Sequence, residues 1–357
     1  MEDIHSYTFG LTSKSKLKLD SVRAFFKKYN IKCEPVKYIP TETDQPLGVE
    51  NTFKCANMRF TTNHEHRFVM SVENGICDDG DVVRDICAVV IMDTQTGNSF
   101  DNKKFIEKSS IIVPHGPIFL KKINGYKAES GLGLSITIGE VLSECFDKPK
   151  DNWMESLCNI PRSTQIKTSI SVFWKSFMEE MVMDHSRLVK NYPKVGMMFQ
   201  DYMPSLYNFT LWEFVTELLI DKIPNPEEID IVVGPELKGS MLGLSVATKL
   251  KRGLVLLRLK GTLPPPTLKQ DNSKKYRSEQ TLEMDICQFN PLIKNEGLKV
   301  LLIDYVRDTG DSIKNMIHLI EKTGNKVAYW LTISDVPGTR EMANKTLDGY
   351  PGSIVFN

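Results

Sequence analysis

The sequence lacks the features of membrane-spanning, exported and disulfide-stabilised proteins. No stretch is long and apolar enough to cross a bilayer, and no apolar segment with a basic flank lies near the N-terminus. The 7 cysteines are odd in number and include no Cys-x-x-Cys pair, which disfavours both a disulfide framework and a zinc ribbon. We therefore expect a cytoplasmic protein that makes no contact with a membrane.

The sequence also has no excess of charge of either sign. Its 45 basic residues balance 45 acidic residues, so no overall field attracts nucleic acid, and we expect no nucleic-acid partner. What the chain does have is 41% hydrophobic and 25% charged residues, a composition typical of globular proteins. Its 357 residues exceed one ordinary core and fit two domains.

Both halves alternate short β-branched runs with amphipathic stretches, which predicts an α/β fold. In the first half we expect strands at residues 7–11, 68–72 and 86–91, helices at 16–29 and 169–183, and a turn at 93–97. A Pro/Gly interruption at residues 191–196 ends this half. We place the boundary just before it, so the predicted domains are 1–184 and 185–357.

The second half has the order of a βαβ series, which predicts a parallel sheet. We expect strands at residues 229–233, 253–259, 299–304 and 326–333, with helices at 211–222, 241–251 and 312–323. Between 259 and 299 we predict only a polar stretch.

Residues 300–312 read as a buried strand, a polar loop and the start of a helix. The free N–H groups of a helix start favour a phosphate, and Gly310 lets the backbone turn close to such a ligand. Thr309 and Ser312 add hydroxyls, and Asp304 can accept hydrogen bonds from a sugar. The alternative is that Asp308 or Ser312 only caps the helix and that Asp304 bonds local backbone.

This segment resembles the ribose-phosphate motif of type I phosphoribosyltransferases, in which an apolar strand and two acidic residues precede a Thr/Gly-rich loop. The rest of the half is similar to adenine phosphoribosyltransferase in order and spacing. The similar segments are residues 192–201 (adenine site), 233–239 (pyrophosphate loop), 257–264 (basic stretch), 276–279 (mobile loop), and 337–341 with 349–351 (tail). The resemblance implies a parallel-sheet phosphoribosyltransferase domain.

The resemblance also implies roles for individual residues. Displacement of pyrophosphate from phosphoribosyl pyrophosphate creates a cation-like ribosyl centre, so the site must hold ribose, phosphate and leaving group and exclude water. The implied catalytic residues are Glu279 in the closing loop, Asp304 on ribose and Asp308 in the phosphate loop, with Mg²⁺ on the leaving group. The implied substrate-binding residues are Met198, Phe199 and Gln200 for the base, Lys238 and Arg258 for pyrophosphate, and Thr309, Gly310 and Ser312 for the 5-phosphate.

The first half has a second candidate loop, residues 13–18, which leads from a strand into a helix. Its N–H groups and lysines can hold a triphosphate, and the alternative is a solvated basic helix start. The loop resembles the nucleotide loop of the inosine/xanthosine triphosphatase family, and residues 45–52 and 68–76 are similar to further segments of that family. The resemblance implies a mixed-sheet α/β domain with substrate residues Ser13, Ser15, Lys18 and Asn74 and the magnesium ligand Glu73.

The leading hypothesis is a purine-salvage enzyme that makes AMP from adenine and is fused to a purine nucleoside triphosphatase-like domain. Its partners would be a purine base, phosphoribosyl pyrophosphate and purine nucleotides, and both resemblances imply a homodimer. A second hypothesis is a non-catalytic nucleotide sensor or interaction protein, because Tyr305 replaces the second motif acid and Asp311 adds a like charge. In the first half Ile39 stands where a second metal ligand is needed, and Ser15 replaces the loop Asn. A third hypothesis keeps only the first half active, as a phosphatase of non-standard purine triphosphates.

Overall fold

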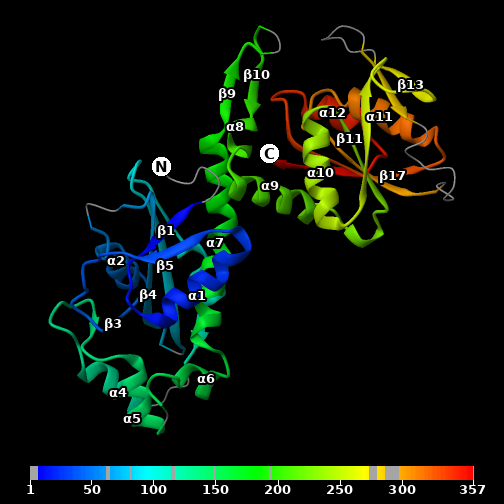
Figure 1. Cartoon of the computed structure of the whole chain (residues 1–357). Coiled ribbons are helices and arrows are strands. Elements are labelled where there is room, and N and C mark those ends of the chain that lie inside the picture. Colours follow the sequence, from blue (N-terminus) through cyan, green and yellow to red (C-terminus); the bar gives the residue numbers. More distant parts are fainter. Residues whose placement is uncertain are drawn as a thin grey trace. The chain divides into compact units, whose positions relative to one another are not determined.

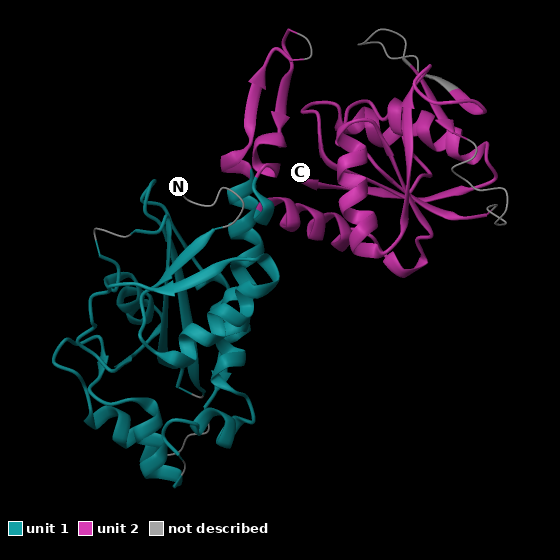
Figure 2. Cartoon of the chain, in the orientation of Figure 1, with its two compact units in different colours: residues 1–182, 208–210 teal, residues 183–207, 211–357 magenta. Residues whose placement is uncertain are grey.

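The structure is a computed structural model that describes residues 7–61, 65–80, 82–113, 117–147, 149–192, 195–272, 280–285 and 297–356. The chain divides into two compact units, shown in Figure 2. Unit 1 comprises residues 1–182 and 208–210, and unit 2 comprises residues 183–207 and 211–357. The boundary expected from the sequence lies after residue 184, and residues 208–210 are the part of the second predicted domain that belongs to unit 1.

Unit 1 contains a mixed sheet with the strand order β2–β1–β4–β5–β6, with β7 paired to β5 (Figure 1). Strand β1 is parallel to both β2 and β4, whereas β4 and β5 form a long antiparallel pair. The bounds are β1 (Thr8–Leu11), β2 (Lys32–Pro35), β4 (Phe68–Asp78), β5 (Val83–Asp93), β6 (Ser99–Asp101) and β7 (Ile111–Ile112), with a separate pair β3 (Gln45–Pro46) and β8 (Gly133–Leu134). The predicted turn at 93–97 is confirmed, because the Gly97 N–H donates to the Asp93 carbonyl.

The predicted elements of unit 1 are in place, but their ends differ: β1 begins at Thr8, and the helix expected at 16–29 is α1 as far as Phe26 and the 3-10 turn η1 after it. The strands expected at 68–72 and 86–91 extend toward each other to form β4 and β5, and the helix expected from residue 169 begins at Arg162 in α7. Aromatic rings of β1, α1 and α7 form the core, including Phe9, Phe26 and Trp174.

The helices of unit 1 are α1 (Lys16–Phe26), η1 (Lys27–Tyr29), α2 (Val49–Met58), η2 (Lys103–Phe105), α3 (Ile106–Ser109), α4 (Pro117–Gly125), α5 (Ile138–Phe146), α6 (Trp153–Cys158) and α7 (Arg162–His185).

Unit 2 contains a sheet of the order β13–β14–β12–β11–β15–β17–β16, with β18 also paired to β17. The strands β12, β11, β15, β17 and β18 run parallel, which confirms the predicted parallel core. The antiparallel strands β13 and β14 lie in the stretch where we expected no strand. The bounds are β11 (Ile231–Pro235), β12 (Gly253–Leu259), β13 (Thr267–Asn272), β14 (Gln280–Asp285), β15 (Lys299–Ile303), β16 (Val306–Arg307), β17 (Lys326–Asp335) and β18 (Gly352–Phe356).

A hairpin of β9 (Arg187–Lys190) and β10 (Met198–Asp201) occupies the region of the Pro/Gly interruption. Asn191 adopts a left-handed conformation and its side chain accepts a hydrogen bond from the Gly196 N–H, so these two residues lie at the end of the hairpin where β9 stops and β10 has yet to begin. The helices of unit 2 are α8 (Met203–Leu206), α9 (Phe209–Asp221, whose first two residues belong to unit 1), η3 (Pro226–Glu228), α10 (Lys238–Leu250), α11 (Asp311–Glu321) and α12 (Arg340–Thr346).

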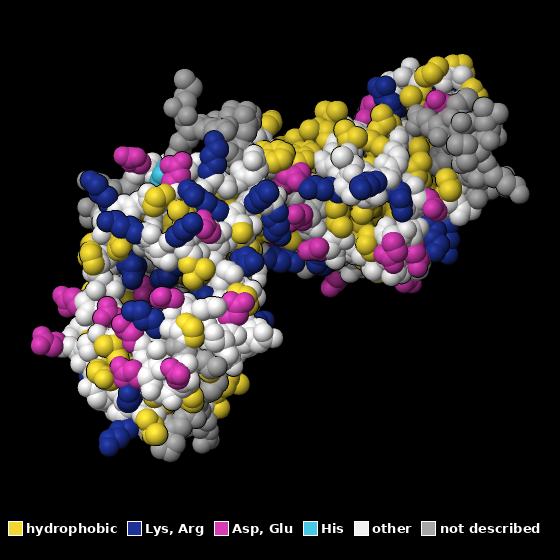
Figure 3. All heavy atoms as spheres, turned by 60° about the horizontal axis from the view of Figure 1, so that its bottom comes forward, with side chains coloured by type: hydrophobic (Ala, Val, Ile, Leu, Met, Phe, Trp, Pro, Cys, Tyr) yellow, Lys and Arg dark blue, Asp and Glu magenta, His cyan; other side chains and the backbone are white. Residues whose placement is uncertain are grey.

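Strands β11 and β15 are parallel neighbours in the middle of this sheet, so the loops that follow them leave at the same edge. Every residue from Val300 to Ile303 is fully buried, and the α11 stripe of Ile313, Met316, Ile317 and Ile320 packs in the same core, as the periodicity predicts. None of the helices in the described ranges combines the length and apolar character that crossing a bilayer requires. On the face shown in Figure 3, basic and acidic side chains are interspersed.

Candidate active site and candidate nucleotide site

The loop between β15 and α11 surrounds a cavity of about 160 Å³. Gly310 is the N-cap of α11 with φ 88°, and a Cβ there would lie 3.1 Å from Leu347 Cγ and 3.2 Å from the Ala343 carbonyl. This glycine therefore meets both a conformational and a steric demand. The lining contains all five loop residues expected from the sequence, namely Asp304, Asp308, Thr309, Gly310 and Ser312, together with Val306, Arg307, Asp311, Ile313 and Met342.

Two side chains of this loop make local hydrogen bonds. The Thr309 hydroxyl donates to Asp311 Oδ2 at 2.7 Å, and Asp304 Oδ1 accepts the Tyr305 N–H at 2.7 Å. The local-backbone alternative for Asp304 is thus observed for one of its oxygens. Asp311 is exposed and shares the cavity lining, so its negative charge faces any phosphate bound there.

Arg307 is a residue of this loop whose structural role was not expected from the sequence. It is 4% exposed and makes a two-point contact with Asp335, Nε to Oδ1 at 2.6 Å and Nη2 to Oδ2 at 2.9 Å. Its Nη1 donates to Asn344, and the guanidinium lies 5.1 Å from the Trp330 ring centroid. Arg307 therefore ties the loop to β17 and α12.

The two cations expected to meet pyrophosphate are both held by carboxylates. Arg258, in β12, donates to Glu236 Oε2 at 2.6 Å. Lys238 is the first residue of α10, and its Nζ lies 3.5 Å from Asp201 Oδ1. Glu236 and Lys238 follow β11 and lie within the predicted pyrophosphate loop at residues 233–239. Each of the two ion pairs therefore has one member in this loop.

The predicted base segment, Met198, Phe199 and Gln200, forms half-buried β10. The Phe199 ring contacts the Tyr192 ring at 5.3 Å and lies 5.7 Å from Lys238 Nζ. Gln200 donates to the Ser186 hydroxyl, so its amide is held within the hairpin. Glu279, expected in the closing loop, lies outside the described residues.

Asp201 ends β10 and is surrounded by donors. Arg187 Nη2 donates to Oδ2 at 2.8 Å, and the Tyr305 hydroxyl donates to Oδ1 at 3.0 Å. Burial by itself would raise the pKa of Asp201, but the hydrogen bonds from Arg187, Met203 N–H and Tyr305 and the charge of Lys238 hold this pKa below its ordinary value. The carboxylate is therefore stabilised in its charged form.

This pKa shift predicts a loss of stability in acid. Because the folded-state pKa is lowered, the stabilisation is fully present above the unfolded value of about 3.9 and is lost as the pH falls through the folded value. Asp201→Asn should flatten the acid limb of the stability of unit 2, as followed by urea unfolding between about pH 6 and 2. An acid limb identical to that of the wild type would contradict the assignment.

Unit 1 has a cavity of about 280 Å³ beside the start of α1. It is lined by four of the five residues expected there, Ser15, Lys18, Glu73 and Asn74, and Ser13 accepts the Ser15 N–H with its hydroxyl. Lys18 Nζ donates to the Val72 carbonyl at 2.6 Å, and burial lowers the Lys18 pKa, although the charge of Glu73 opposes this shift.

Glu73 contacts basic side chains at the position where the resemblance implies a bound metal ion. Its Oε2 lies 2.5 Å from Arg59 Nε and 4.0 Å from Lys18 Nζ. Asp44 lines the same cavity, whereas Ile39 is 49% exposed and is not among the lining residues. The described part of the chain holds no group of three or more His, Cys, Asp or Glu suited to a metal. A magnesium ion at Glu73 would therefore have to displace the Arg59 guanidinium, so these residues fit the ion poorly.

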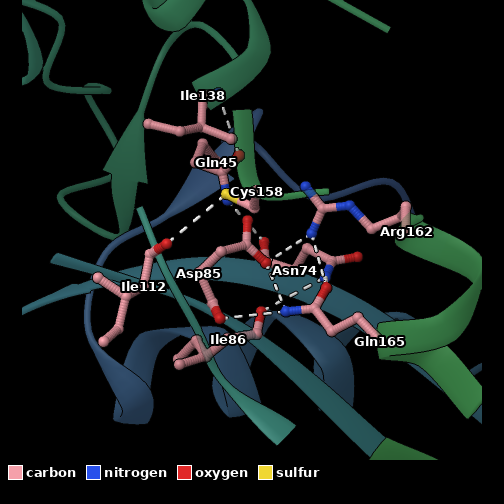
Figure 4. A network of polar contacts seen from close by, with 9 residues as sticks. All are labelled: Gln45, Asn74, Asp85, Ile86, Ile112, Ile138, Cys158, Arg162 and Gln165. Atoms are coloured by element: carbon pink, nitrogen blue, oxygen red, sulfur yellow. Dashed lines mark hydrogen bonds and ion pairs between the residues drawn. The ribbon is translucent and has the colours of Figure 1, made fainter. Parts of the chain in front are cut away.

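A buried polar network lies behind this cavity (Figure 4). Gln45 donates to the Asn74 carbonyl, and Asn74 donates to Gln165 Oε1 at 3.2 Å. Gln165 and Arg162 both donate to fully buried Asp85, at 2.8 and 2.5 Å. The network fixes β3, β4 and β5 to the start of α7. The sequence predicted Asn74 as a site residue but not its link to Asp85 and Gln165, because these residues lie on three elements that are far apart in the chain.

Unit 2 thus has a largely parallel sheet with a loop at a helix start and neighbouring basic side chains at its carboxyl edge, an α/β arrangement whose chemistry suits a phosphorylated ligand. The phosphoribosyl transferase domain family matches residues 212–355. An adenine phosphoribosyltransferase of Bifidobacterium adolescentis is 30% identical over 168 residues, covering 47% of this chain and 83% of the relative. An adenine phosphoribosyltransferase of Mycoplasma mobile is 34% identical over 139 residues, covering 39% of this chain and 76% of the relative.

The chain belongs to the phosphoribosyltransferase family, and it is a transferase enzyme. A solved adenine phosphoribosyltransferase from Rhodothermus marinus is 30% identical with a TM-score of 0.44, covering 50% of this chain and 98% of the other.

Proposed function

We propose that unit 2 transfers the phosphoribosyl group of phosphoribosyl pyrophosphate to adenine, forming AMP and releasing pyrophosphate. The observation that carries this proposal is the gathering of the predicted loop residues around one cavity at the carboxyl edge of the parallel sheet. The relatives from Bifidobacterium adolescentis and Mycoplasma mobile are adenine phosphoribosyltransferases, which supports adenine as the acceptor.

The residues have separate tasks in this reaction. The α11 start and the hydroxyls of Thr309 and Ser312 bind the 5-phosphate, and Asp304 accepts a hydrogen bond from a ribose hydroxyl. Lys238 and Arg258 exchange their carboxylate partners for pyrophosphate oxygens as that group leaves. The bond from the ribose anomeric carbon to pyrophosphate breaks, the bond to the base nitrogen forms, and the base loses its proton.

The oxygen donors of this cavity fit Mg²⁺, because the Asp304 and Asp308 carboxylates both line it and Mg²⁺ prefers oxygen ligands. When bound, the ion neutralises charge on the departing pyrophosphate. Asp304 and Asp308 are the residues that would hold it together with substrate oxygens.

The direct test incubates the full chain with phosphoribosyl pyrophosphate, Mg²⁺ and one purine base at a time. Adenine should give AMP and pyrophosphate in equal amounts. Product from hypoxanthine or guanine alone would keep the transfer reaction but reject adenine. No nucleotide from any base at high enzyme concentration would reject the transfer reaction itself.

Phe199→Ala should weaken binding of the base. Stacking of a base on an aromatic ring contributes roughly 1–3 kcal/mol, so the KM for adenine should rise about 5- to 150-fold. The KM for phosphoribosyl pyrophosphate should change little, because the ring lies in the base segment. Tyr207→Ala, at a ring that is 76% exposed, is the control, and equal effects of the two changes would contradict the role of Phe199.

For unit 1 we propose binding and hydrolysis of non-standard purine triphosphates, supported by the cavity that gathers Ser15, Lys18, Glu73 and Asn74. Inosine triphosphate should yield phosphate or pyrophosphate, and Glu73→Gln should lower this release, because it removes the carboxylate charge beside Lys18 and Arg59. The control is Glu50→Gln, whose carboxylate is exposed and paired with Lys103. Thermal stabilisation by the nucleotide without turnover would instead make unit 1 a sensor.

We further propose that residues 1–184 and 185–357 fold separately, that the protein is cytoplasmic, and that it acts as a homodimer. Separate expression of each segment, followed by hydrogen exchange, tests the domains. Sedimentation of the full chain tests the dimer, and a monomer at assay concentration would reject it.

A further inference from the structure

Tyr305 stands at the second acidic position of the phosphoribosyl motif, where its identity alone suggests a lost ribose contact. The structure gives this side chain a different task. Tyr305 is 5% exposed, and its hydroxyl donates to Asp201 Oδ1 at 3.0 Å while accepting the Tyr202 N–H at 2.7 Å. Asp201 and Tyr202 are the end of β10 and the residue after it, so the hydroxyl binds the base of the hairpin that carries Phe199.

The ring of Tyr305 contacts a second part of the site. Lys238 Nζ lies 4.3 Å from the centre of this ring and 3.5 Å from Asp201 Oδ1. A cation above an aromatic face is attracted by the ring electrons, and the carboxylate adds a second attraction. Tyr305 and Asp201 together therefore determine where the first side chain of α10 lies.

We propose that Tyr305 is a positioning residue that links the base segment to the pyrophosphate loop, its hydroxyl fixing Asp201 and its ring fixing Lys238. This inference rests on the proposed phosphoribosyl transfer. On this inference Tyr305 has a function in the site that differs from that of the motif acid, and its presence is not a sign of lost activity. One side chain then contacts both the hairpin that carries Phe199 and the first residue of α10, Lys238.

The hydroxyl is suited to this link because it stays protonated. Burial and the charge of Asp201 raise the Tyr305 pKa above its ordinary value, so it remains a donor at every physiological pH. An aspartate at this position would remove the donor and add a second negative charge in a buried region near Asp201.

The test compares Tyr305→Phe with Tyr305→Asp in the full chain. Tyr305→Phe keeps the ring under Lys238 but deletes the charge-assisted hydrogen bond, so the KM for the base should rise about tenfold while the KM for phosphoribosyl pyrophosphate stays nearly constant. Tyr305→Asp restores the motif acid and should nevertheless have a lower kcat/KM than Tyr305→Phe. The control is Tyr350→Phe, which removes a hydroxyl that contacts His318 elsewhere in unit 2.

Wild-type kinetics in Tyr305→Phe, or kcat/KM at or above wild type in Tyr305→Asp, would overturn the inference. A double-mutant cycle of Tyr305→Phe and Asp201→Asn decides the link even if the wild type forms no nucleotide. The losses of urea midpoint should be clearly non-additive, because the two groups share one hydrogen bond. Additive losses would overturn the link, whereas absence of product from the wild type would count against the proposed function only.

Discussion

Arg307→Ala is expected to lower the free energy of unfolding of unit 2 by about 3–5 kcal/mol, the usual cost of removing one partner of a buried ion pair. The reason is that Asp335, whose side chain is 6% exposed, would lose its two-point partner and keep only Arg340 at 2.9 Å. Hydrogen exchange of β17 and α11 amides under native conditions measures the loss in unit 2 alone.

Arg340→Ala is the matched control, because Arg340 binds the same carboxylate from a side chain that is 48% exposed. Exposed ion pairs contribute about 0–1 kcal/mol, so this change should be small. Equal losses in the two variants would show that Arg307 is not the main partner of Asp335.

Asp304→Asn should reduce kcat/KM for phosphoribosyl pyrophosphate about 10- to 150-fold. Replacing the carboxylate by an amide weakens a charge-assisted hydrogen bond to the ribose, which is worth roughly 1.5–3 kcal/mol. The position at the end of β15 and on the cavity lining supports this contact. Steady-state kinetics with varied phosphoribosyl pyrophosphate and saturating base gives the measurement.

The matched control is Asp221→Asn, an exposed carboxylate at the end of α9. It should leave kcat/KM unchanged. If Asp304→Asn also had wild-type kcat/KM, the carboxylate could not be the ribose ligand, and the local bond from the Tyr305 N–H would be its main role.

The phosphate loop could be predicted from the sequence because its signals are local. The apolar run Val300–Ile303, the glycine at 310 and the apolar stripe of α11 lie within about two dozen residues. Each of these features indicates a buried strand, a tight turn or a buried helix face without reference to a distant part of the chain. Strand β12 was predicted at its exact residues for the same reason, since Gly253 and an apolar run mark its start and course.

What could not be predicted depends on partners distant in the chain. Strand β13 has a polar sequence and exists because it pairs with β14, whose Leu282 and Met284 turn into the core. Arg307 gives no sign in the sequence of its partner Asp335, which lies on another strand. In unit 1 the cavity is lined by Asp44 and not by Ile39. The position of Asp44 follows from the pairing of β3 with β8, which the spacing of residues along the sequence does not reveal.

Trp330 contacts both Arg307, which lies over its ring, and Gly352, where an added Cβ would be only 2.0 Å from the indole ring. Its Nε1 donates to the Tyr350 carbonyl, so the indole is held in one orientation. Any ligand that shifts Arg307 changes the electric field on this chromophore. In a Trp212→Phe variant Trp330 is the single tryptophan of unit 2, beside Trp153 and Trp174 of unit 1. A change of its intrinsic fluorescence when a ligand of unit 2 is added therefore offers a label-free optical signal of loop occupancy.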